Sequence, residues 1–212
     1  RDISEEVKLA QMREDLVHML VHDLRSPLTV LKGSFALLLQ TLEDKQQPEL
    51  AIEMIGMAER STNRMMEMVN GLLDIAKLED GQMPLYTKAI SAAELFQDVI
   101  LRIQRLADDA NLQIESVVEA DLPELHIDPQ HIRRVLENLL DNAIKFTPDG
   151  GKIQLWARRD GEQVPAMFLL GVTDTGPGVA SELKKKLFQK FTMDASIQSR
   201  RKGTGLGLAY CK

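Results

Sequence analysis

The residues of this chain whose types are best suited to catalysis are a histidine and an aspartate, His22 and Asp23. They begin residues 22–28, His-Asp-Leu-Arg-Ser-Pro-Leu. An imidazole has an ordinary pKa of about 6.5, so much of it is neutral and nucleophilic at neutral pH. The Asp23 carboxylate can accept the Nδ1 proton in a hydrogen bond, which leaves Nε2 of His22 free to attack an electrophile. Pro27 removes a helical hydrogen bond to the Asp23 carbonyl and predicts a bend just beyond the histidine. Such a conflict with regular helix geometry is more typical of a functional site than of a packing solution.

Two asparagines and a lysine further along the chain have the chemistry of a metal and phosphate site. Asn138 and Asn142 are four residues apart in a segment with helical periodicity, so they share one face of that helix. Side-chain amide oxygens are neutral, hard ligands that suit Mg²⁺, which keeps several waters and phosphate oxygens. Lys145 follows on the same helix and would neutralise phosphate charge. An asparagine on a helix is more often an ordinary solvated residue, so this pattern alone leaves both interpretations open.

Two glycine-containing blocks could bring the backbone close to a ligand. Residues 174–178 read Asp-Thr-Gly-Pro-Gly after a predicted strand, where an aspartate can accept a hydrogen bond from an amine such as that of adenine. The alternative there is an ordinary Asp-Gly turn. Residues 203–208 read Gly-Thr-Gly-Leu-Gly-Leu, so their amide N–H groups and a following helix dipole could surround an anion. Their spacing matches neither the dinucleotide fingerprint nor the Walker loop. Residues 196–202 are polar and basic, as expected of a mobile lid over phosphates.

The first third of the chain must supply the helices that position His22. Apolar residues at helical spacing run from Leu9 to Leu42 and again from about Glu49 to Leu78, and residues 43–48 predict a turn between them. Two long helices joined by a short loop form an antiparallel hairpin. Both apolar stripes need further partners, which favours a dimeric four-helix bundle. The alternative is a monomeric hairpin packed on the rest of the chain.

After a linker at residues 79–84 the pattern becomes mixed α and β. Ser91 and Glu94 form a capping box that opens a helix to about Asp109, and Asp128 with Pro129 opens a second helix to about Phe146. Strands are predicted at residues 113–118, 152–158 and 167–174.

Composition narrows the partners and the compartment. The net charge of −6 argues against nucleic acid or an anionic membrane surface as the main partner. Cys211 is the single cysteine, which excludes an intrachain disulfide and favours a reducing, cytoplasmic location. The absence of a long apolar run and of a signal peptide predicts a soluble fragment, whose parent protein can still be membrane-associated.

Read in order, these blocks resemble the sensor histidine kinases of two-component signalling, and the resemblance covers nearly the whole chain. Residues 22–28 resemble the H box, 138–147 the N box, 174–178 the first glycine box, 188–191 the phenylalanine box and 203–207 the second glycine box.

The resemblance implies an α + α/β fold in four parts. These are a coiled-coil signal linker (1–17), a dimerisation and histidine-phosphotransfer domain (18–78), a hinge linker (79–85) and a gyrase-type α/β sandwich that binds ATP (86–212). It further implies a homodimer, a response-regulator receiver domain as partner and a PAS-type sensor upstream of residues 1–4. The family's sandwich continues with further strands, so we expect this domain to be incomplete at Lys212.

The resemblance also assigns roles to residues. His22 would be the phosphoacceptor and Asp23 its acid-base neighbour, while Asn138 and Asn142 would bind Mg²⁺ and phosphates. The other residues expected to bind nucleotide are Lys145, Phe146 (stacking on adenine), Asp174, Gly176, Gly178, Gly203, Thr204, Gly205, Leu206 and Gly207.

Two departures from the family pattern bear on function. Ser26 stands where many relatives carry Thr or Asn to orient a water, so phosphatase activity on the regulator is an open question. Met193 stands where an arginine is common, and we expect Arg200, Arg201 or Lys202 to supply the missing positive charge at the phosphates.

Three rival interpretations remain. His18 and His22 could form a metal pair, but Met19 stands where the zinc-protease pattern has glutamate. A gyrase-like ATPase would need a water-activating glutamate, and Glu137 is one residue from Asn138, on a different face. A non-catalytic dimeric scaffold is disfavoured because the principal ATP-box residues are present. His126 and His131 are expected to be surface residues.

Overall fold

The computed structural model describes residues 21, 23–41, 48–161, 167–190 and 205–212 of the chain. They fall into two compact units, Arg1–Asp74 and Ile75–Lys212. His22, the predicted coiled coil and residues 196–204 lie outside the described residues.

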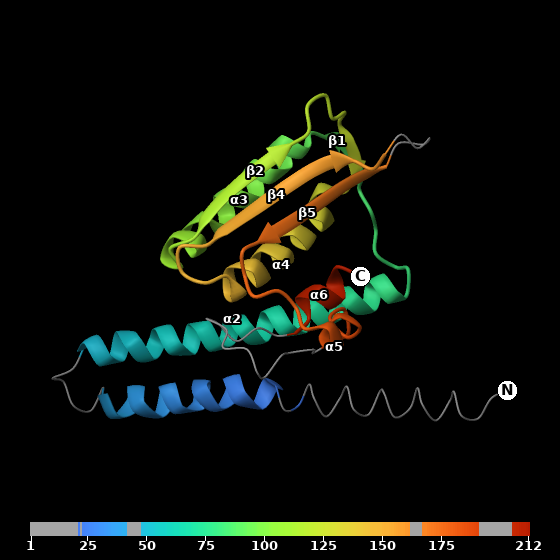
Figure 1. Ribbon diagram of the computed structural model, residues 1–212. Coiled ribbons are helices and arrows are strands. Elements are labelled where there is room, and N and C mark those ends of the chain that lie inside the picture. Colours follow the sequence, from blue (N-terminus) through green and yellow to red (C-terminus); the bar gives the residue numbers. More distant parts are fainter. Residues whose placement is uncertain (1–20, 22, 42–47, 162–166, 191–204) are drawn as a thin grey trace. The chain divides into compact units, whose positions relative to one another are not determined.

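The first unit is a helical hairpin, as predicted. Residues 23–41 form the first helix of the hairpin, and α2 (Pro48–Glu79) forms the second (Figure 1). Pro27 is buried inside the first helix, and its carbonyl oxygen accepts a 3.0 Å hydrogen bond from the Ser61 hydroxyl of α2. The proline that interrupts the helical ladder is therefore also a point of attachment between the two helices.

The hairpin buries one apolar stripe and leaves other apolar side chains exposed. Met54, Ser61 and Met68 are buried along one side of α2. Other apolar side chains of α2 are solvent-exposed in two groups, with spacings of three or four residues inside each group. These are Ile52 and Ile55, and Met66, Val69 and Leu73.

The second unit is a mixed α/β domain. Its elements are β1 (Lys88–Ile90), α3 (Ala92–Asp109), β2 (Gln113–Val118), β3 (Leu125–Ile127), α4 (Pro129–Phe146), β4 (Lys152–Arg159), β5 (Phe168–Asp174), α5 (Ser181–Lys184) and α6 (Gly207–Tyr210). The order β2-β4-β5 forms one sheet, in which β2 pairs parallel and β5 antiparallel with β4. β1 and β3 form a separate antiparallel pair that the sequence did not predict, because three-residue strands show no periodicity.

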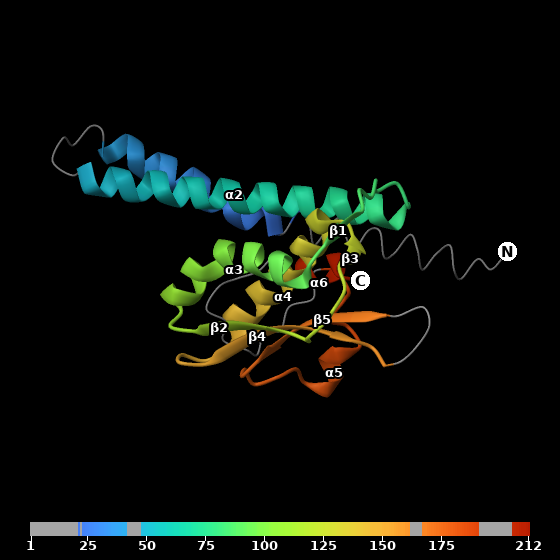
Figure 2. The same cartoon turned by 90° about the horizontal axis from the view of Figure 1, so that it is seen from above.

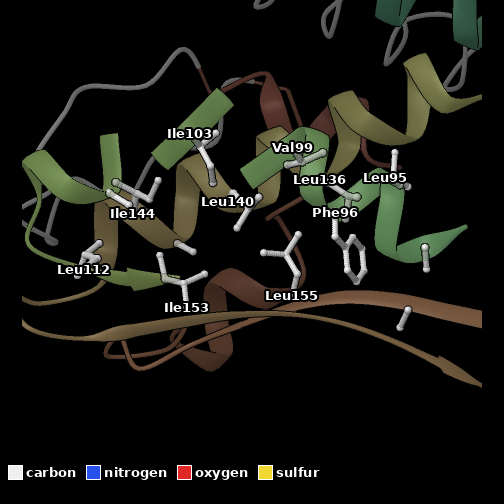
Figure 3. Packing of buried hydrophobic residues seen from close by; sticks show 14 of the residues in the cluster. Leu95, Phe96, Val99, Ile103, Leu112, Leu136, Leu140, Ile144, Ile153 and Leu155 are labelled. Atoms are coloured by element: carbon white, nitrogen blue, oxygen red, sulfur yellow. The ribbon is translucent and has the colours of Figure 1, made fainter. Parts of the chain in front are cut away.

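Helices α3 and α4 cover one face of the three-stranded sheet (Figure 2). Side chains from both helices meet Ile153 and Leu155, which alternate along β4 (Figure 3). Each helix begins at its predicted cap: the Ser91 hydroxyl accepts from the Glu94 N–H at 3.1 Å, and Asp128 caps α4. Within the described residues, no helix combines the length and apolar character needed to cross a bilayer.

Leu140 tests this core. It is fully buried in α4, so Leu140→Ala should lower the free energy of unfolding by about 2–5 kcal/mol in urea denaturation. Leu101→Ala on α3 is the matched control, since Leu101 is 72% exposed. Equal losses in the two variants would contradict the packing described.

Candidate functional site

Helix α4 is the platform of the site, and one carboxylate fixes its first turn. Asp128 Oδ1 accepts from the backbone N–H groups of Gln130 and His131 at 2.9 and 3.2 Å. Its Oδ2 accepts from the backbone N–H of Tyr86 at 2.7 Å. These bonds, that of Tyr86 foremost, lower the pKa of Asp128 from its ordinary value despite the opposing effect of burial.

The two asparagines of α4 meet the last glycine block. Asn138 and Asn142 are both half-buried. Gly207, the first residue of α6, lies so close to Asn138 that a Cβ at position 207 would be 3.0 Å from the Asn138 Oδ1 atom. Leu206 is buried beside it, and α6 packs on α4. The described part of the second glycine block, residues 205–207, therefore lies against the N-box helix at Asn138.

The other glycine block lies at the C-terminal end of α4. Asp174 Oδ1 accepts a 2.8 Å hydrogen bond from the Gly176 N–H. A Cβ at position 176 would be 2.6 Å from that same oxygen and 3.2 Å from the Phe146 carbonyl oxygen. Gly178 has a positive φ of 73°, which favours glycine. The aspartate, the tight turn and the end of α4 are thus brought together.

Two polar side chains near this end of α4 have contrasting surroundings. The Lys145 ammonium pairs with the Asp141 carboxylate one turn earlier, an interaction that the sequence analysis missed although the spacing of four residues indicates it. The Thr147 hydroxyl oxygen is buried and has no hydrogen-bond partner among the described residues. A buried, unpaired hydroxyl is costly, so this end of the site suits a bound water or ligand.

Glu137 is engaged on the α3 side of the platform. Its carboxylate is 3.9 Å from Arg102 of α3, which also pairs with Asp98 at 3.5 Å. The glutamate that the gyrase-like interpretation requires is therefore held towards α3 and not at Gly207.

Not all predicted residues are brought together here. Asp23 is half-buried and Ser26 exposed in the helical unit. Arg200, Arg201, Lys202, Gly203 and Thr204 lie outside the described residues.

His131 corrects one prediction. We expected a surface residue, but its side chain is only 23% exposed and its Nδ1 lies 2.7 Å from the Tyr210 hydroxyl oxygen. His126 is exposed, as expected. Cys211 directly follows α6 and is half-buried, and burial raises the pKa of its thiol to about 11.

Comparison with known proteins identifies the two units. Residues 12–81 match the family model of the His Kinase A (phospho-acceptor) domain. Residues 127–212 match that of the histidine kinase-, DNA gyrase B-, and HSP90-like ATPase. The chain belongs to the sensor histidine kinases.

Similar kinases are known in sequence and in structure. The chain is 34% identical over 222 residues to the adaptive-response sensory kinase SasA of Synechococcus sp. (strain JA-2-3B'a(2-13)), covering 99% of this chain and 58% of that protein. The Acinetobacter baumannii histidine kinase AdeS has 26% identity and a TM-score of 0.65, over 89% of this chain and 83% of that chain. Full-length ShkA in complex with AMPPNP has 27% identity and a TM-score of 0.66, over 93% and 39%. The chain thus spans a little over half of SasA.

The lowered pKa of Asp128 predicts a pH-dependent contribution to stability. The ionised carboxylate stabilises the fold above its ordinary pKa, and this contribution is lost as pH falls through the lowered value of the folded state. The stability difference between the parent chain and Asp128→Asn should therefore shrink between pH 5 and pH 3 in urea titrations. Asp121→Asn, at an exposed position, controls for the loss of one negative charge. A difference that grows towards pH 3 would contradict this account.

Proposed function

We propose that this chain is the catalytic core of a protein-histidine kinase. It transfers the γ-phosphoryl group of ATP to His22 and then to an aspartate on the receiver domain of a response regulator. The observation that supports the proposal is the contact between Gly207 and Asn138, which brings together two blocks that we propose to bind phosphate. The similarity to ShkA, a kinase solved with AMPPNP, supports a nucleotide in this position.

The residues of the site divide between the two ends of ATP. The Asp174 carboxylate, oriented by the Gly176 N–H, would accept from the adenine amine, and Phe146 would stack on the base. Near the middle of α4, where Gly207 lies against Asn138, the backbone of residues 205–207 would donate N–H groups to the phosphates.

The donor set of α4 also fits Mg²⁺. Asn138 and Asn142 present neutral amide groups one turn apart, and no side chain at Gly207 intervenes. Bound Mg²⁺ would neutralise charge on the triphosphate. The Lys145 ammonium pairs with Asp141, so it would add positive charge at the phosphates only on leaving that carboxylate.

His22 is the proposed nucleophile. Asp23 would accept its Nδ1 proton, and Nε2 would form the N–P bond while the bond from the γ-phosphorus to the bridging oxygen breaks and ADP leaves. His22 and the nucleotide belong to different units, so residues 79–85 are the proposed hinge. Ser26 is exposed and stands four residues after His22 in the sequence, and its hydroxyl would orient a water for dephosphorylation of the regulator.

The hairpin is proposed to dimerise through its exposed apolar side chains. One hairpin leaves a set of apolar side chains on α2 exposed, namely Ile52, Ile55, Met66, Val69 and Leu73. A second hairpin would complete a four-helix bundle of the expected kind.

Radiolabelling with γ-³²P-ATP tests the proposed kinase. The chain should acquire covalent label that is acid-labile and base-stable, and His22→Gln should abolish it. His18→Gln, four residues earlier in the sequence, should retain it. Release of free phosphate without bound label would support the ATPase instead. The absence of both bound label and free phosphate would support the scaffold.

Gly207 gives a prediction for the nucleotide pocket. Gly207→Ala places a methyl group against the Asn138 amide, so affinity for Mg²⁺·AMPPNP should fall by about tenfold or more in calorimetry. Gly33→Ala is the control, since a Cβ there would have no neighbour within 4 Å. Unchanged affinity in Gly207→Ala would count against the assigned site.

The basic segment gives a separate prediction. Arg200, Arg201 and Lys202 are proposed to replace the charge absent at Met193. Replacing all three with Gln should weaken ATP binding and slow autophosphorylation. If both quantities stayed at the parent level, the assignment of these residues would be wrong.

A further inference from the structure

Four residues from three segments connect the last glycine block to the end of the linker. The Tyr210 hydroxyl lies 2.7 Å from His131 Nδ1, and His131 Nε2 lies 3.9 Å from Asp128 Oδ2. That oxygen accepts the 2.7 Å hydrogen bond from the backbone N–H of Tyr86, directly after the hinge linker at residues 79–85. In the tautomer that carries its proton on Nε2, Nδ1 of His131 accepts from the Tyr210 hydroxyl.

Two members of the cluster are buried. Tyr210 and Asp128 are each 7% exposed. The Arg134 guanidinium lies 4.2 Å from the centre of the Tyr210 ring, so the ring is held by packing and a cation–π contact independently of its hydroxyl. The hydroxyl therefore orients a ring that is already buried.

Tyr210 belongs to the same short turn as the phosphate-binding backbone. Its N–H donates to the Leu206 carbonyl at 3.1 Å, and α6 contains only the four residues Gly207–Tyr210. A helix this short has no stability of its own, so its position depends on side chains that anchor it to α4. Tyr210 is such an anchor, and the position of Gly207 against Asn138 depends on it.

We propose that Tyr210 and His131 are positioning residues for the nucleotide. They hold residues 205–207 at the phosphate site and, through Asp128, couple the occupancy of that site to the backbone at Tyr86. This inference rests on the proposed function. Because coupling is reciprocal, an ordered nucleotide site stabilises the Tyr86 hydrogen bond, and loss of that bond weakens the nucleotide site.

Variants of the pair test the positioning role through nucleotide affinity. Tyr210→Phe removes only the hydroxyl and should raise the Kd for Mg²⁺·AMPPNP, and the KM for ATP, by about fivefold with kcat nearly unchanged. His131→Leu should have the same effect, and the double variant no more than either alone. His131→Asn, which keeps an acceptor near the position of Nδ1, should restore most of the affinity.

Tyr86→Phe is the matched control, because its side chain is 76% exposed and its backbone N–H is retained. Additive losses in the double variant, or no loss in Tyr210→Phe, would overturn the positioning role.

Hydrogen exchange separates this role from a merely structural one. Mg²⁺·AMPPNP should slow exchange of the Tyr86 amide in the parent chain but much less in Tyr210→Phe. If AMPPNP binds the parent chain and leaves Tyr86 exchange unchanged, the coupling is wrong while the proposed function stands. If AMPPNP does not bind the parent chain at all, both proposals fail.

Discussion

The amide oxygen of Asn138 and the backbone of Gly207 approach so closely that even a methyl group at position 207 would press against the oxygen. This contact joins the middle of the chain to its last described residues. It requires α4 to be correctly placed, because a shift of Asn138 along the helix axis would open or close the space beside Gly207. The core packing and the N-cap of the ATP-binding unit both hold α4 in place.

Helix α4 meets this requirement because one of its faces is packed in the core while another carries the polar side chains of the site. Leu136 and Leu140 bury one face against α3 and the sheet, while Asn138 and Asn142 keep their amides on another. The Asp128 carboxylate fixes the first turn. Glu137 lies on a different face of the helix from Asn138, and its carboxylate is 3.9 Å from Arg102 of α3.

Local rules predicted much of this arrangement. The caps at Ser91 and Asp128 and the long strands were found because each depends on neighbouring residues alone. The face shared by Asn138 and Asn142 follows from helical spacing. Pairing across the chain was beyond such rules: β1 and β3 are too short to show a pattern, and the burial of His131 depends on Tyr210, which no local spacing connects to it. The positions of His22 and the basic lid remain predictions from the resemblance.

The central claim is that the nucleotide site of one unit supplies the electrophile for a histidine of the other. The most direct test is the chemical identity of the phosphorylated product, by ³¹P NMR and by tandem mass spectrometry at neutral to basic pH after incubation with Mg²⁺·ATP. The account predicts a phosphoryl group on the peptide that contains His22, bonded to Nε2. A phosphoryl group on Ser26 or any other hydroxyl, or an unmodified chain with ATP intact, would contradict it.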